Sequence, residues 1–154
     1  MRQELDNKLC QRFPTIFRDR NADSKTTLMC YGFSCGDGWF QLIWDLCLEL
    51  EKLHPKVVAT QVKEKFGGLR FYYTTVEEEL DGILGVSLRN NKAFNLISQA
   101  EARSYQICEW CGKPGSITKP KHWVHTLCSK CRKKEEKGQR EGHWPWVIAK
   151  SWIK

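Results

Sequence analysis

Two Cys-x-x-Cys pairs limit the possible folds of this chain more than any other feature of its sequence. The pairs are Cys108 with Cys111 and Cys128 with Cys131, and sixteen residues separate them. Four thiolates at this spacing can close a tetrahedral Zn²⁺ site. The four cysteines are therefore the predicted metal ligands, and Zn²⁺ is the predicted cofactor.

The residues around the two pairs indicate how this segment folds. Gly112 follows the first pair and permits the tight turn of a zinc knuckle. Residues 115–127 can form a short hairpin, and the second pair opens a charged helical run. This order predicts a treble-clef-like module over residues 105–141. A zinc ribbon is the second interpretation, but it would end in another knuckle. A site whose four ligands all come from the protein is closed, which argues against catalysis.

The remaining sequence favours reduced cysteines. The chain contains no run of about 18 apolar residues, and residues 1–6 lack the apolar centre of a signal peptide. We therefore expect a cytoplasmic protein without a membrane span. Cysteines in that compartment are more often metal ligands than disulfides. A redox-active pair would need only one Cys-x-x-Cys in a βαβ setting, and the sequence shows no such setting.

Two further cysteines leave a second metal site open. Cys30 and Cys35 lie in a stretch rich in glycine and aromatic residues, and they could bind a metal together with Cys10 or Cys47. The gap between Cys30 and Cys35 is looser than a knuckle. Cys47 falls on the apolar side of a predicted helix, where buried reduced cysteine is common.

Nuclease activity is a further hypothesis, and the histidines between the two cysteine pairs bear on it. His-Asn-His nucleases can carry two Cys-x-x-Cys pairs around a catalytic histidine. Here the gap between the pairs contains only His122 and His125. This gap of sixteen residues leaves little room for a catalytic strand, an Asn-bearing loop and a second catalytic histidine. Because a side chain can act as an acid or base only where the fold places it correctly, the short gap argues against nuclease activity. We expect both histidines to be surface or hairpin residues.

The first two thirds of the chain predict helices around a β-hairpin. Residues 3–13, 38–53 and 91–105 show helical spacing of apolar residues, and Asp37 is placed to cap the second helix. Residues 57–75 alternate around Gly67-Gly68, which predicts a hairpin with this pair at its turn. An isolated hairpin is not stable, so it should pack on helix 38–53.

The predicted fold class is α+β, with a helix–β-hairpin–helix body over residues 1–104 that forms one compact unit with the zinc module. A short helix within 76–90 is also expected.

Positive charge is concentrated towards the C-terminus. Residues 1–102 hold 13 Lys and Arg against 14 Asp and Glu, whereas residues 103–154 hold 12 against 4. This asymmetry predicts an acidic partner, although a basic cluster can also be a solvated face. The Trp-rich tail, residues 142–154, could stack on bases, insert into a partner, or fold back on the zinc module. The predicted partner-binding residues are Lys130, Arg132, Lys133, Lys134, Lys137, Arg140, Trp144, Trp146 and Trp152.

Four motifs of the chain occur in a recognisable order. They are Cys35-Gly36-Asp37-Gly38-Trp39, the stretch 61–72 (Gln-Val-Lys-Glu-Lys-Phe-Gly-Gly-Leu-Arg-Phe-Tyr), Ala100-Glu101, and the first Cys pair with Pro114-Gly115. Together they resemble a family of small zinc-binding proteins of tailed bacteriophages and prophages. Members of that family often end the second pair in Cys-x-x-His, where this chain has Cys131, and the long basic tail also departs from their pattern. The resemblance implies a phage accessory protein, but it transfers no active site.

These features predict macromolecular binding rather than catalysis. The leading hypothesis is an accessory protein that inhibits or modulates a host complex for nucleic-acid handling or defence. Phosphate-mimicking inhibitors are typically acidic and this chain is basic, so it should contact nucleic acid or an acidic protein surface. A zinc-finger regulator that binds DNA or RNA directly is the alternative function, and a nuclease is the third.

Overall fold

The chain adopts a mixed α+β fold with a cluster of four cysteines near its C-terminus. The structure is a computed structural model, and it describes residues 1–53, 56–75, 91–118 and 124–137. The expected helix within 76–90, His122, Arg140 and the whole Trp-rich tail lie outside the described residues. Among the described helices, none is both long and apolar enough to cross a membrane.

The central sheet has three strands in the order β1-β2-β3. Strand β1 (Phe33–Ser34) runs parallel to β2 (Val57–Lys65), and β2 is antiparallel to β3 (Gly68–Thr75). The hairpin predicted over 57–75 is therefore present, but the predicted position of its turn is wrong by one residue. Lys65 pairs with Gly68, so the two turn residues are Phe66 and Gly67. Both have positive φ, 56° and 79°, as a type I′ turn requires.

The helices begin close to the predicted positions. Helix α1 spans Gln3–Arg12, α2 spans Phe40–Leu53 and α4 spans Asn91–Ser104. A 3₁₀ turn, Asp37–Trp39, precedes α2. The Asp37 side chain does not cap this helix, contrary to the prediction, because its carboxylate accepts hydrogen bonds from the backbone N–H and the Nε of Arg2.

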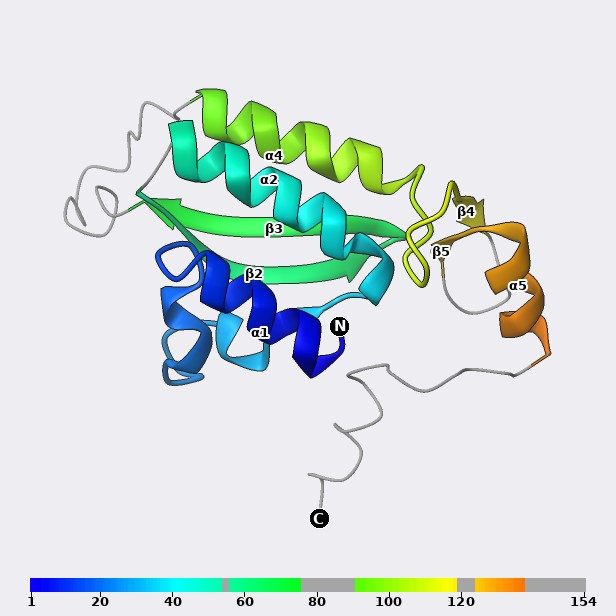
Figure 1. Ribbon diagram of the computed structural model, residues 1–154, viewed down its shortest axis with the longest axis horizontal. Coiled ribbons are helices and arrows are strands. Elements are labelled where there is room, and N and C mark those ends of the chain that lie inside the picture. The colour runs from blue at the N-terminus through cyan, green and yellow to red at the C-terminus, as the bar shows by residue number, and fades with distance from the viewer. Residues whose placement is uncertain (54–55, 76–90, 119–123, 138–154) are drawn as a thin grey trace, which may run out of the picture.

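The apolar stripes of the helices meet on one face of the sheet. Helices α2 and α4 lie side by side, and α4 runs along β3 (Figure 1). The core residues of α2 are Leu42, Ile43, Leu46, Cys47 and Leu50, and those of the sheet are Phe33, Val57, Ala59, Val62, Leu69 and Phe71. Trp39 is fully buried at the start of α2. The hairpin thus shares one core with the helix on which it was expected to pack.

Helix α4 also covers the free edge of the sheet. The Oγ of Ser104 accepts the backbone N–H of Leu69 at 2.9 Å, and Oε1 of Glu101 accepts that of Phe71 at 3.0 Å. These N–H groups belong to β3, the edge strand among the described residues, where no described strand pairs with that side. Side chains of α4 therefore satisfy donors that would otherwise offer a pairing edge.

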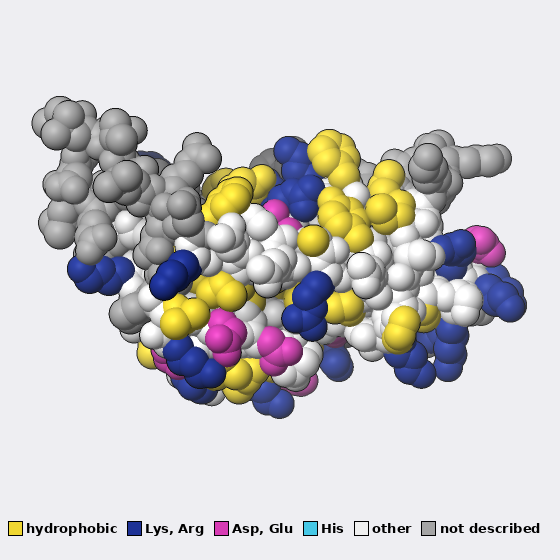
Figure 2. All heavy atoms as spheres, turned by 90° about the horizontal axis from the view of Figure 1, so that it is seen from above, with side chains coloured by type: hydrophobic (Ala, Val, Ile, Leu, Met, Phe, Trp, Pro, Cys, Tyr) yellow, Lys and Arg dark blue, Asp and Glu magenta, His cyan; other side chains and the backbone are white. Residues whose placement is uncertain are grey.

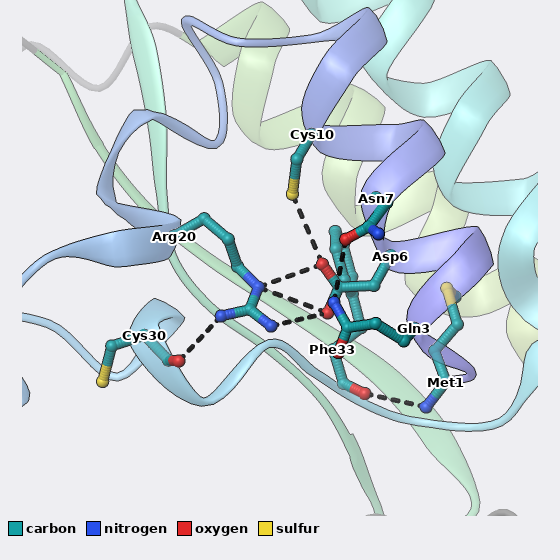
Figure 3. A network of polar contacts seen from close by, with 8 residues as sticks. All are labelled: Met1, Gln3, Asp6, Asn7, Cys10, Arg20, Cys30 and Phe33. Atoms are coloured by element: carbon teal, nitrogen blue, oxygen red, sulfur yellow. Dashed lines mark hydrogen bonds and ion pairs between the residues drawn. The ribbon is translucent and has the colours of Figure 1, made fainter.

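A buried ion pair ties α1 to the segment before β1 (Figure 3). The Asp6 carboxylate lies 3.0 Å from both Nε and Nη2 of Arg20, and Arg20 also donates to the carbonyl oxygen of Cys30 at 2.8 Å. Gly32, with a φ of 75°, leaves room for this pair, because a Cβ there would overlap the Asp6 carboxylate. Burial and the Asp6 carboxylate raise the pKa of the neighbouring Cys10 thiol to about 12.

Replacing Asp6 with alanine is expected to lower the free energy of unfolding by about 3 kcal/mol, because it leaves the guanidinium of Arg20 without its counter-charge in a largely buried place. Urea denaturation followed by circular dichroism measures this loss. Arg12→Ala is the matched control: it breaks the surface pair with Glu51, whose side chains are 42% and 45% exposed, and should cost no more than about 1 kcal/mol. Equal losses for both variants would contradict the structural role of the Asp6 pair.

Candidate metal centre

The four predicted ligands come together in space. The sulfur atoms of Cys108, Cys111, Cys128 and Cys131 all lie within 4.8 Å of one another. The Sγ atoms of Cys111 and Cys128 are 3.7 Å apart. A tetrahedral ion with Zn–S bonds of about 2.3 Å needs sulfurs about 3.8 Å apart. The donor type, the number of donors and their spacing thus all fit one tetrahedral metal ion.

The backbone of the first pair forms a tight loop around its sulfurs. The N–H of Cys108 donates to the carbonyl of Lys113 at 2.7 Å, and the N–H of Gly112 donates to the carbonyl of Cys108 at 2.9 Å. Gly112 has a φ of 73°, a left-handed conformation that would be strained in a residue with a side chain. The role predicted for this glycine is therefore confirmed by its conformation.

The second pair lies where a strand passes into a helix. Strands β4 (Ser116–Thr118) and β5 (His125–Leu127) are antiparallel, and α5 (Ser129–Glu136) follows directly. Cys128 is the N-cap of α5, and its sulfur accepts the backbone N–H of Cys131 at 3.4 Å. Burial alone would raise the pKa of Cys128, but this hydrogen bond and the neighbouring thiols lower it to about 7. Burial raises the pKa of Cys108 and of Cys131. A bound cation would favour the thiolates of all four.

The cysteine centre is attached to the body through the Cys35-Gly36-Asp37-Gly38-Trp39 motif. The backbone N–H of Gly38 donates to the carbonyl of Glu109 at 2.8 Å, and Nε1 of Trp39 donates to the carbonyl of Ile107 at 2.9 Å. A Cβ on Gly38 would overlap the carbonyl oxygen of Cys108, and one on Gly36 would overlap the carbonyl oxygen of Glu109. Both glycines are thus required for the close approach of two segments about 70 residues apart in the sequence.

A second contact joins the hairpin turn to β5. The hydroxyl of Thr126 donates to the carbonyl of Gly67 at 2.6 Å, and the carbonyl of Thr126 accepts the N–H of Glu109 at 2.9 Å. Thr126 is fully buried. The cysteine centre therefore contacts the body at two places, the turn before α2 and the turn between β2 and β3.

His125 lies in the hairpin, which is one of the two places expected for it, and its side chain is buried at the centre of this arrangement. It lies on β5 of the hairpin and is 5% exposed. Its Nδ1 is 3.4 Å from Oε2 of Glu109, and its Nε2 is 3.3 Å from Oε1 of Glu135 on α5. The buried Glu109 also accepts the N–H of Gly36 at 3.0 Å through Oε1. Sequence reasoning named His125 but missed its partners Glu109 and Glu135, because no local pattern shows that three separate segments converge.

Comparisons with models of known protein families, with curated proteins and with solved structures find no match. The interpretation of this site therefore depends on its own residues alone.

The basic residues predicted to bind a partner are only partly described. Lys130, Lys133 and Lys137 are exposed on or just after α5. Lys134 is half-buried, and the half-buried Arg132 donates to the Oγ of Ser116 at 3.2 Å. Figure 2 shows Lys and Arg side chains gathered at the end of the molecule that carries α5. Three of the five described cations are thus available to a partner.

The hypothesis of a second metal site at Cys30 and Cys35 gains no support from the described residues. Only the four C-terminal cysteines form a potential metal-binding group there. The Sγ of Cys30 donates to the carbonyl of Thr27 at 3.1 Å. Burial raises the pKa of Cys35 to about 12 and that of Cys47 well above its ordinary value. Cys35 and Cys47 belong to the hydrophobic core, which explains their presence without a metal.

Proposed function

We propose that the cysteine cluster holds one structural Zn²⁺ and that residues 105–137 form a treble-clef-like module around it. The support is the fit of four sulfur donors to a tetrahedral ion, together with the order of turn, hairpin and helix. Cys108, Cys111, Cys128 and Cys131 would be the ligands. The bound ion would supply a cross-link between the turn, β5 and α5, and the module would reinforce the helix–β-hairpin–helix body through Gly38 and Trp39.

The function that fits this arrangement best is the binding of an acidic macromolecule. A site with four protein ligands leaves no position for water or substrate on the metal, so the ion has a structural role. The observation that carries the proposal is the set of exposed lysines on α5 and directly after it, Lys130, Lys133 and Lys137, next to a cluster that would fix the start of this helix. Cations held in a fixed arrangement attract an acidic surface more selectively than cations on a loose chain.

The proposed partner is a host complex that handles nucleic acid or acts in defence, and the protein would act as a phage-type accessory factor that inhibits or modulates it. The motif resemblance supports the phage context, and the positive charge supports an acidic surface on the partner. Direct binding of DNA or RNA by the same helix is the alternative.

Affinity capture from a bacterial host lysate, with and without nuclease treatment, tests this proposal. The double variant Lys130→Glu/Lys133→Glu should lose the captured complex, while Lys8→Glu/Lys92→Glu, which changes two exposed lysines on α1 and α4 by the same charge, should keep it. Capture that survives nuclease supports a protein partner. Capture that disappears with nuclease favours the nucleic-acid alternative, and capture that is equal for both double variants would contradict a role for α5.

A further inference from the structure

The face of the β2–β3 hairpin that points away from the core carries cations and no carboxylate. Val62, Leu69 and Phe71 face the core. Because side chains alternate along a strand, their neighbours Lys63, Lys65, Arg70 and Tyr72 lie on the opposite face. The register places Lys63 beside Arg70 and Gln61 beside Tyr72. Glu64 is the one acidic residue in these two strands, and it is buried on the core side, where Oε1 accepts the N–H of Gly67 at 2.7 Å.

Aromatic rings accompany these cations. The Nζ of Lys63 lies 5.3 Å from the ring centre of Tyr72, and the Nζ of Lys65 lies 5.4 Å from that of Phe66. Tyr72 is 42% exposed and Phe66 is 70% exposed. The guanidinium of Arg70 lies 5.9 Å from the ring centre of Tyr105 and donates to its hydroxyl at 2.9 Å. Exposed rings next to cations are the elements with which proteins hold single-stranded nucleic acid: rings stack on bases, and cations contact phosphates.

The backbone of Phe66 supports a role beyond folding. Its φ of 56° is left-handed, a conformation that is costly for a bulky residue, and asparagine or glycine is preferred at this position of a type I′ turn. Its ring gains little from burial, because most of its surface is exposed. Strained residues of this kind concentrate at binding sites.

A hollow of about 420 Å³ continues this surface beyond Tyr72. Tyr72, Gln61 and Leu28 line it, together with Lys25 and the hydroxyl-bearing residues Thr26 and Thr60. Its apolar wall could receive a base, and its hydroxyl groups and the lysine could bind sugar or phosphate oxygens.

We propose that this outer face of β2 and β3 binds single-stranded nucleic acid, with Tyr72 and Phe66 stacking on bases and with Lys63, Lys65 and Arg70 contacting phosphates. A single strand fits better than a duplex, because the rings need unpaired bases. The proposed site is separate from α5, and it does not depend on the function proposed above.

Fluorescence anisotropy with a labelled oligothymidine of about 20 nucleotides tests the proposal on the full chain with its metal. Tyr72→Ala should weaken binding about 5- to 100-fold, the range for loss of one stacked base. Tyr72→Phe should retain affinity, because it keeps the ring. Phe94→Ala, which removes a ring that is 47% exposed on α4, is the matched control and should bind like the wild type. Lys63→Gln should make the dependence of log affinity on log salt shallower by about 0.7.

Phe66→Asn separates binding from folding. Asparagine followed by glycine suits a type I′ turn, so this variant should unfold at a higher temperature than the wild type, yet bind the oligonucleotide several-fold more weakly. Wild-type affinity in both Phe66→Asn and Tyr72→Ala would overturn the proposal. The proposal would also be overturned if Lys130→Glu/Lys133→Glu were the only variant to lose binding, because that result would place the nucleic acid on α5. Undetectable binding at low salt would also overturn it and leave a protein as the candidate occupant.

Discussion

Replacing Gly38 with alanine is expected to lower the free energy of unfolding by about 3 kcal/mol and to separate the cysteine centre from the body. The new Cβ would overlap the carbonyl oxygen of Cys108 and the backbone nitrogen of Gly112, and neither is a flexible side-chain end that could turn aside. Overpacking of this kind costs about 1–3 kcal/mol. The shift would also weaken two hydrogen bonds, from Gly38 N–H to Glu109 and from the Trp39 indole to Ile107.

Urea denaturation of Gly38→Ala, followed by Trp fluorescence and circular dichroism, measures this effect. Asp37→Ala is the matched control, since it changes the neighbouring residue and removes only solvent-accessible contacts with Arg2, the ion pair and the hydrogen bond from the Arg2 backbone N–H. It should cost no more than about 1 kcal/mol. If Gly38→Ala were as stable as Asp37→Ala, the close packing of the motif on the cysteine loop would be wrong.

Replacing Cys131 with serine is expected to unfold the segment from residue 105 to 137 and to lower the stability of the whole chain. Metal binding supplies about 10–16 kcal/mol in zinc-finger peptides, and a small module with few core residues depends on it. The core of this segment comprises Cys108, Leu127 and Cys131, with Trp110 and Cys128 packed against them, and three of these five residues are proposed ligands. Loss of the ion would therefore remove the contacts that hold β5 and α5 in place.

Amide hydrogen exchange of Cys131→Ser shows which parts open. Exchange should become fast in β5 and α5, and it should also rise around Gly38 and Trp39, because their partners are in the cysteine loop. Cys30→Ser is the control: it alters a cysteine outside the cluster and keeps a donor towards Thr27, so exchange and metal content should remain as in the wild type. A metal content that falls in Cys30→Ser would revive a second metal site.

The features that depend on local sequence patterns could be predicted from the sequence. The apolar stripe of α2, the alternation of the hairpin and the spacing of the cysteines each indicate their structure within a few residues. The position of the hairpin turn could not be predicted in this way. Gly68 belongs to β3 and not to the turn, and Phe66 takes a left-handed position in the turn instead. Glycine is required at position 68 for another reason, because the ring of Tyr105 packs where a Cβ would be.

The features that depend on distant segments were not predictable from one sequence. Gly36 and Gly38 stand in a stretch rich in glycine and aromatic residues, and the reason that glycine is required there becomes visible only when the cysteine loop lies against them. His125 was expected at the surface or in the hairpin, and its position in the hairpin does not reveal that its two carboxylate neighbours come from positions 109 and 135. In both cases the deciding contact joins parts of the chain that local periodicity does not relate.

The proposed zinc ion would be held by four cysteines and would join the basic helix to the body. Native mass spectrometry of the purified chain, before and after treatment with a chelator, is the decisive measurement. We expect one zinc ion per chain in the native protein, and a shift to highly charged, unfolded forms once the ion is removed. A chain that carries no metal and keeps its compact charge distribution, or one that remains compact after the ion is lost, would contradict the claim.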